Sequence, residues 1–266
     1  MDEFANLSLE GVSKSFGPSL RRSVTAVDDV SMQFESGGTT VGVVGESGSG
    51  KSTLARMLVG LIPPSKGSIS YNGVELGRVL QGKAERREFR SRVQFVGQDT
   101  TSSFDPRRAL RDAVRLPAMK LSGLDRDGAD RRVDEVLALL GLPKELADRR
   151  PDQVSGGQRQ RFALARCLVV SPRILICDEV VSALDVSVQG SILNLLKRYC
   201  TENRAGMVFV SHGLPATAFI SDQLIVMYRG QIVDRGTTAE IIGGRNVHPY
   251  TARLLEAHRG RKVSTA

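Results

Sequence analysis

Residues 45–53 read Gly45-Glu46-Ser47-Gly48-Ser49-Gly50-Lys51-Ser52-Thr53. The apolar run 40–44 before them has the composition of a buried strand, and the apolar residues of 54–58 after them have helical spacing. Glycines let backbone N–H groups turn inward around a polyphosphate, and the start of a following helix adds partial positive charge. This order of strand, loop and helix predicts a polyphosphate-binding loop.

The spacing fits the pattern G-x-x-x-x-G-K-[ST], which is the P-loop of nucleoside triphosphatases. In such a loop Lys51 would reach the β- and γ-phosphates, and the Ser52 hydroxyl would coordinate Mg²⁺. The alternative is a glycine-rich turn that matches by chance. The strand and helix on its two sides favour the P-loop.

Three later segments indicate which class of nucleotide-binding protein this is. Ser155-Gly156-Gly157-Gln158 opens a helical pattern that its serine can cap. A buried strand over 174–177 ends in the two carboxylates Asp178-Glu179, and another over 208–211 ends at His212. Carboxylates and a histidine at strand ends are suited to phosphoryl transfer, which depends on positioning and charge neutralisation.

In this order the segments resemble the ATP-binding subunits of ABC transporters, from about Leu7 to about Leu255. The signature 155–158 is the most specific part, because the P-loop is shared by many unrelated ATPases. The resemblance implies an α/β fold, with a P-loop NTPase (RecA-like) core, an N-terminal antiparallel β subdomain and an inserted α-helical subdomain. The implied division is 1–98 and 158–245 for the ATPase core with its β subdomain, 99–157 for the helical subdomain and 246–266 for a C-terminal helix and tail.

The resemblance also implies how ATP is bound. In this family two subunits face each other head to tail, and each ATP lies between the P-loop of one and the signature of the other. The residues implied to contact the chain's own ATP are Phe16, which would stack on adenine, and Gly45, Glu46, Ser47, Gly48, Ser49, Gly50, Lys51, Ser52 and Thr53. Those implied to meet the partner's ATP are Ser155, Gly156, Gly157 and Gln158, with Asp185 at the dimer seam.

The implied catalytic set is Glu179, His212, Gln98 and Lys51. Glu179 would polarise the attacking water as general base, and His212 would contact the γ-phosphate. Ser52, Gln98 and Asp178, the last through water, would hold Mg²⁺. The ordinary alternatives are a surface carboxylate at Glu179 and core residues at His212 and Phe16; the places of Glu179 and His212 after apolar strands favour the functional interpretation.

The chain departs from the family pattern at a few positions. Val154 stands where leucine is usual, Val180 and Val181 stand where proline and then threonine or valine are common, and Gly213 replaces a frequent acidic residue. None of these changes removes an expected catalytic side chain. We therefore expect a half-site able to hydrolyse ATP.

Several segments resemble the subfamily that imports peptides, nickel and related solutes. They are the stretch 98–107, which reads QDTTSSFDPR, Glu46 in the P-loop, and His248-Pro249-Tyr250-Thr251 with a helical run after it. Members often pair with a related ATPase, so a heterodimer is as compatible with the sequence as a homodimer. Some carry a C-terminal cysteine cluster, but this chain has no cysteine after Cys200.

Secondary-structure patterns add an outline. Strands are expected up to about Phe34 with a turn at Gly17-Pro18, an amphipathic helix over 133–140, and a hairpin of strands 223–227 and 231–234. The tail from Arg259 is polar. In the family, a groove between the helical subdomain and the core, near Gln98, receives a short helix of the membrane subunit.

Composition bears on location and partners. The sequence contains no run that could span a bilayer and no signal peptide at its start, and its three cysteines have no metal-ligand spacing. We expect reduced core cysteines and a peripheral protein on the cytoplasmic face of the inner membrane. The formal net charge of +8 is spread along the chain and tryptophan is absent, so no nucleic-acid partner is expected.

The function implied is that of an ATPase that drives an importer through dimer closure and hydrolysis. Its partners would be a second ATP-binding subunit, transmembrane permease subunits and, indirectly, an extracytoplasmic solute-binding protein. The alternative is the ATPase of a soluble enzyme complex such as carbon–phosphorus lyase, which looks similar. A DNA-repair or translation ATPase would usually show a coiled coil, zinc-binding cysteines or a second ATPase domain.

Overall fold

The computed structural model describes residues 4–17, 23–99, 103–181, 184–245 and 247–261. Expectations on other residues lie outside the described part of the chain: Pro18 in the turn, residues 100–102 in the QDTTSSFDPR stretch, Ser182-Ala183 before Asp185, and the end of the tail.

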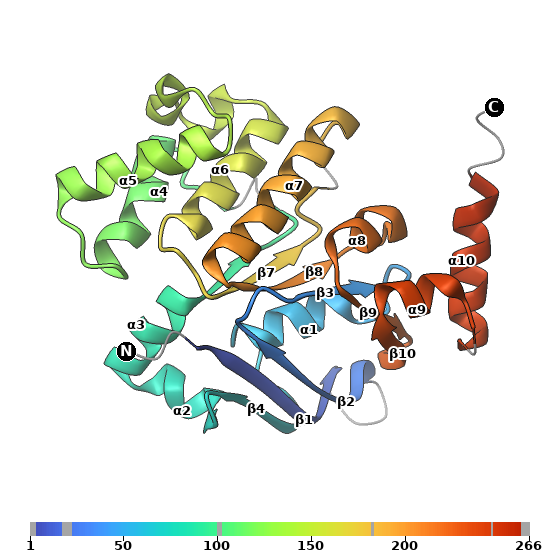
Figure 1. The fold of residues 1–266 in the computed structure, drawn as a ribbon. Helices are drawn as coiled ribbons and strands as arrows, with labels where there is room; N and C mark the ends of the chain where they lie inside the picture. The colour runs from blue at the N-terminus through green and yellow to red at the C-terminus, as the bar shows by residue number, and fades with distance from the viewer. Residues whose placement is uncertain (1–3, 18–22, 100–102, 182–183, 246, 262–266) are drawn as a thin grey trace.

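A mainly parallel sheet forms the centre of the molecule (Figure 1). Its strand order is β10-β9-β3-β8-β7-β6, and only the β9–β10 pair is antiparallel. The bounds are β3 (Thr40–Val44), β6 (Val93–Val96), β7 (Ile174–Asp178), β8 (Gly206–Val210), β9 (Gln223–Tyr228) and β10 (Gln231–Thr237). Every residue of β3, β7 and β8 is buried, as expected for parallel strands covered on both faces.

Alternate residues of the central strands belong to two different apolar cores. Ile176 and Val208 pack with the α1 helix (Lys51–Leu58) and the second sheet, whereas Cys177 and Phe209 pack with α6 (Gly156–Leu168) and α7 (Val186–Asn203). The side-chain period of two along a strand produces this division. The predicted α/β fold is confirmed.

The second sheet is antiparallel, with strand order β2-β1-β4-β5. Leu7 and Leu9 of its strand β1 alternate inward and are buried. The bounds of these strands, and of the helices that follow them, are β1 (Asn6–Phe16), β2 (Val24–Glu35), β4 (Lys66–Tyr71), β5 (Val74–Glu75), α2 (Leu76–Gln81) and α3 (Lys83–Arg92). The predicted N-terminal strands are therefore present.

A helical layer lies on the side of the central sheet away from the second sheet (Figure 1). It comprises α4 (Leu110–Lys120), α5 (Arg126–Leu139), the 3₁₀ turns η2 (Lys144–Asp148) and η3 (Pro151–Gln153), and the start of α6. The helix expected over 133–140 ends at Leu139, and Gly141 follows with φ of 62°.

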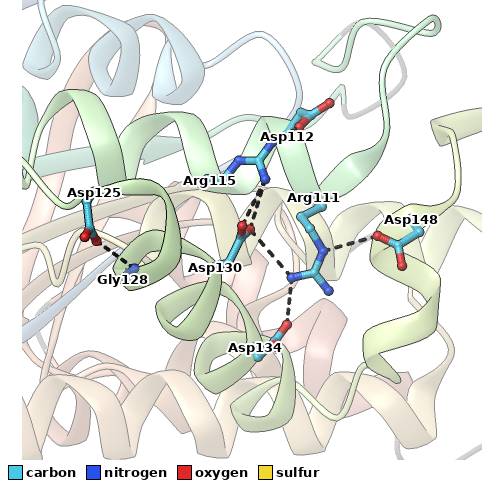
Figure 2. A network of polar contacts seen from close by, with 8 residues as sticks. All are labelled: Arg111, Asp112, Arg115, Asp125, Gly128, Asp130, Asp134 and Asp148. Carbon is cyan, nitrogen blue, oxygen red and sulfur yellow. Dashed lines mark hydrogen bonds and ion pairs between the residues drawn. The ribbon is translucent and has the colours of Figure 1, made fainter.

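An arginine–aspartate network joins α4, α5 and η2 (Figure 2). Arg111 Nη1 lies 2.8 Å from Asp134 Oδ1, and Arg111 Nε lies 3.2 Å from Asp148 Oδ1. Arg115 binds both oxygens of Asp130 at 3.1 Å and also contacts Asp112. Both guanidinium groups are mostly buried, so these ion pairs are screened less than surface pairs.

The last part of the chain returns to the central sheet. The hairpin expected at 223–227 and 231–234 is β9 and β10, and it is followed by α9 (Thr238–Gly243) and α10 (Pro249–Arg261). The α8 helix (Leu214–Ile220) precedes it and packs on β3 and β8. Leu255 of α10 belongs to a third apolar cluster with Val44 and Val226. Figure 1 shows α10 at the edge of the molecule away from α4 and α5.

Cys167, Cys177 and Cys200 are buried free thiols, as predicted. Burial raises the pKa of the Cys167 thiol to about 11 and that of Cys200 to about 12. Within the described ranges, no helix combines the length and apolar character needed to cross a bilayer.

Candidate nucleotide site

The P-loop leaves β3 at its carboxyl end and enters α1. Two of its glycines have positive φ and press against neighbouring backbone, Gly45 at 156° and Gly50 at 101°. A Cβ at Gly45 would lie 2.2 Å from the Met227 carbonyl oxygen, and one at Gly50 would lie 2.0 Å from that of Ala26. Only glycine fits both places, which explains their positions in the motif.

Lys51 begins α1 and is 5% exposed. Its ammonium donates to the carbonyls of Gly45 at 2.9 Å and Glu46 at 2.7 Å, and to Ser49 Oγ at 3.2 Å. Burial lowers the pKa of Lys51, although the nearby carboxylates Glu179, Asp178 and Glu46 act in the opposite direction. The Lys51 ammonium therefore lies inside the P-loop, held by the loop's own oxygen atoms.

Asp178 ends β7 directly opposite the start of α1. The Ser52 hydroxyl donates to Asp178 Oδ1 at 2.9 Å. The other oxygen, Oδ2, is buried and has no hydrogen-bond partner among the described residues. Burial raises the pKa of this carboxyl, partly offset by the Ser52 hydrogen bond. A hydroxyl and a carboxylate oxygen side by side are the ligand types that Mg²⁺ prefers.

Glu179, His212 and Gln98 come together at one edge of the sheet. Gln98 Nε2 donates to Glu179 Oε2 at 3.3 Å, and His212 Nδ1 lies 3.1 Å from Glu179 Oε1. These residues follow β7, β8 and β6, which are adjacent parallel strands whose carboxyl ends meet at the same edge. Glu179 has φ of 54°, and its N–H donates to the Val210 carbonyl at 2.9 Å.

The signature opens α6, in the helical layer. Ser155 Oγ accepts the Gln158 N–H at 3.2 Å, and Gln158 Oε1 accepts the Ser155 N–H at 2.9 Å. This capping box confirms the expected helix start. A Cβ at Gly156 would meet no heavy atom within 4 Å, so the helix start is open to another molecule.

The structure gives the following environments for the remaining predicted positions. Phe16 ends β1, is 45% exposed and has the Lys14 ammonium 5.3 Å from its ring centroid. Asp185 is exposed at the start of α7, and Glu46, Ser47 and Gly48 are exposed on the P-loop.

The departures from the family pattern are accommodated locally. Val180 and Val181 are 0% and 4% exposed and join the same apolar core as Val154. Gly213 precedes α8, and its N–H donates to Ser211 Oγ at 3.0 Å. The turn after Glu179 is thus packed by apolar side chains in place of the usual proline.

Sequence reasoning missed one contact of the P-loop. The Glu46 N–H donates to the Tyr250 hydroxyl at 2.7 Å, from α10. The sequence pattern around Tyr250 served only as a subfamily marker. It carried no signal of what the hydroxyl would contact.

The fold, the P-loop and the grouping of Gln98, Glu179 and His212 define a P-loop nucleoside triphosphatase. Similar solved structures agree with this class. The chain is similar to the dimeric structure of MJ0796, a bacterial ABC transporter cassette, with a TM-score of 0.80 and 26% identity. A second matching structure is MJ0796 in a dimeric post-hydrolysis state bound to ADP and Pi, with a TM-score of 0.79 and 26% identity. Each match covers 87% of this chain and 98% of the other.

Sequence comparison gives the family. A family model described as ABC transporter matches residues 27–182. A putative peptide import ATP-binding protein of Brucella abortus is 41% identical over 89% of this chain and 70% of its own length. The oligopeptide transport ATP-binding protein OppF of Salmonella typhimurium is 39% identical over 89% and 70%. OppD of Mycobacterium bovis is 41% identical over 91% of this chain but 39% of its own length. The chain belongs to the ATP-binding cassettes of ABC transporters and is an ATPase.

Proposed function

We propose that this chain binds and hydrolyses MgATP to power a peptide importer. The observation that carries the proposal is the grouping of Glu179 with Gln98 and His212 beside the P-loop. In this reading Glu179 accepts a proton from the attacking water. Gln98 and His212 hold its two oxygens in place, which fixes the direction of attack.

The P-loop would bind the phosphates. Lys51 and the inward N–H groups would neutralise charge that develops on the γ-phosphate. Burial lowers the pKa of Lys51 and so disfavours its charged form, whereas an anionic phosphate would favour the charged form. Phe16, half-exposed at the end of β1, would stack on the adenine.

Asp178 and Ser52, with Gln98, fit a Mg²⁺ site. The partnerless buried oxygen of Asp178 supports this assignment, because a cation would compensate its desolvation. When bound, the cation would neutralise part of the negative charge of the ATP phosphates. Asp178 and Ser52 would orient it, and their mutual hydrogen bond already holds both side chains at one place.

A second ATP-binding subunit would complete the site. The open signature at Ser155-Gly156-Gly157-Gln158 and the exposed Asp185 support a head-to-tail pair, in which each signature caps the partner's γ-phosphate. ADP lacks that phosphate, so ATP would favour the closed pair and hydrolysis would release it. Whether the second subunit is another copy or a related chain is an outcome of the test below.

The peptide assignment and the membrane location rest on the relatives. Those described above are named for peptide import or oligopeptide transport. A permease would carry the chain on the cytoplasmic face of the membrane, with a solute-binding protein beyond it. A pocket whose lining includes Leu116 and Pro117 together with the charged Arg108 and Asp112 offers a partly apolar contact for the permease, and Leu116 is 51% exposed there.

The test is to isolate tagged E179Q from native membranes with MgATP and to identify what remains bound. We expect a multi-span permease and an ATP-binding partner, and uptake assays on that transporter should show peptides as its solute. Nickel uptake alone would contradict the peptide assignment. Recovery of soluble enzyme subunits only, with no chain in the membrane fraction, would contradict transport and favour an enzyme complex of the carbon–phosphorus lyase kind.

A further inference from the structure

The Tyr250 hydroxyl contacts the P-loop at Glu46, the residue after its first glycine. The hydroxyl accepts the Glu46 N–H at 2.7 Å across 204 positions of sequence. Tyr250 is 7% exposed, and its hydrogen bond to the exposed residue Glu46 is partly buried. The neighbouring loop carbonyls of Gly45 and Glu46 accept from Lys51, on the phosphate-binding side.

The Tyr250 ring is itself held firmly. It stacks on Tyr228 of β9, with ring centroids 4.3 Å apart and an angle of 22° between the planes. Asp234 Oδ2 accepts the His248 N–H at 2.9 Å and also the Thr251 hydroxyl, which fastens the turn before α10 to β10. The hydroxyl therefore stands at a fixed point relative to the sheet.

The β9–β10 hairpin supports the same loop at two further places. The Gly230 N–H donates to the Ser49 carbonyl at 3.1 Å, and the Met227 carbonyl lies against Gly45. Together with Tyr250 these contacts hold the outer side of the P-loop. Its phosphate-binding side carries the Lys51 ammonium.

We propose that Tyr250 is a positioning residue of the nucleotide site, which holds the P-loop in its phosphate-binding shape through the Glu46 N–H. This inference rests on the proposed binding of ATP at the P-loop. Without the hydroxyl, the partly buried Glu46 N–H lacks a partner and the loop gains other conformations. Nucleotide binding must then order the loop, and affinity falls. By linkage, nucleotide binding should also strengthen the docking of segment 247–261.

The test is Tyr250→Phe in the full chain, which removes the hydroxyl and keeps the stacked ring. We expect the Kd for MgATP and MgADP and the KM for ATP to rise roughly 5- to 10-fold, the effect of about one hydrogen bond, with kcat little changed. Hydrogen exchange at the Glu46 amide should accelerate in the nucleotide-free chain. Asp234→Asn, which weakens the support of the same turn, should change Kd in the same direction and serves if Y250F is insoluble.

The matched control is Tyr199→Phe, because the Tyr199 hydroxyl is also buried but donates to the Pro172 carbonyl at 3.0 Å. It should lower stability without changing Kd. If Y250F and Y199F bind nucleotide equally well and Glu46 exchanges at the wild-type rate, the inference is wrong. A wild-type chain that binds no nucleotide would instead contradict the proposed function, and the inference with it.

Discussion

At the residue scale, the buried carboxylate of Asp178 lowers the free energy of unfolding of the chain. Burial raises the pKa of this carboxyl above its ordinary value of 3.8. The folded chain therefore binds the proton more tightly than the unfolded chain does, and ionisation of Asp178 opposes folding. This cost is absent at low pH, where the carboxyl is protonated in both states, and is complete above the folded-state pKa.

Asp178→Asn should consequently be more stable than the wild type at pH 7, and the difference should shrink as the pH falls through the raised pKa. The same variant should lose Mg²⁺-dependent ATP hydrolysis. Thermal unfolding from about pH 4, near the ordinary pKa, up to pH 8 measures the first effect. Asp152→Asn, at an exposed position, is the matched control for the change of aspartate to asparagine. A D178N chain less stable than wild type at pH 7 would contradict the assignment of a desolvated carboxylate.

At the element scale, the arginine–aspartate network determines how η2 packs on α4 and α5. The Arg111 side chain is 19% exposed and lies between Asp134 and Asp148 (Figure 2). Its removal would break the ion pairs with Asp134 and Asp148, whose side chains are 48% and 72% exposed, and the contact with Asp130, which is 29% exposed. The chain from η2 runs on to η3 and the signature, so this packing supports the start of α6.

Arg111→Ala should reduce the free energy of unfolding by about 1–2 kcal/mol, as measured by urea denaturation. The matched control is Arg198→Ala, whose pair with Glu202 on α7 has side chains 61% and 65% exposed. That change should cost less than about 1 kcal/mol. Equal losses in the two variants would show that the network contributes no more than a surface pair.

The sequence predicts elements well where the signal is local. Strand β3 and the P-loop lie within a few residues of each other, and the capping box at Ser155 is complete in four positions. The grouping of Gln98 with Glu179 joins residues 81 positions apart, and it was predicted only through the family resemblance. The roles given to these residues stay predictions until tested.

The contact between Tyr250 and Glu46 could not be predicted in this way. It spans 204 positions and depends on how the β9–β10 hairpin and α10 pack against the loop. Local spacing around Pro249 indicates a helix start, which the structure contains, but it does not specify what the next side chain meets. Long-range contacts of this kind follow from packing and not from a motif.

At the scale of the whole molecule, the two halves of the proposed ATP site lie on different elements of one chain. Gln98, Glu179 and His212 follow the carboxyl ends of β6, β7 and β8, and the signature lies at the start of α6. In two chains related head to tail, the sheet edge that carries Glu179 in one chain would face the signature of the other chain. In such a pair, Glu179 of each chain would activate water for the ATP held between the two chains.

The most direct test is ATP hydrolysis by E179Q, with its oligomeric state followed at the same time. The account predicts hydrolysis at least about 100-fold slower than wild type and a dimer that persists in MgATP and dissociates in MgADP. Gly156→Asp in the same background should still bind ATP but remain monomeric, since this open position faces the partner in the proposed pair. An E179Q chain that hydrolyses ATP at the wild-type rate would contradict the account.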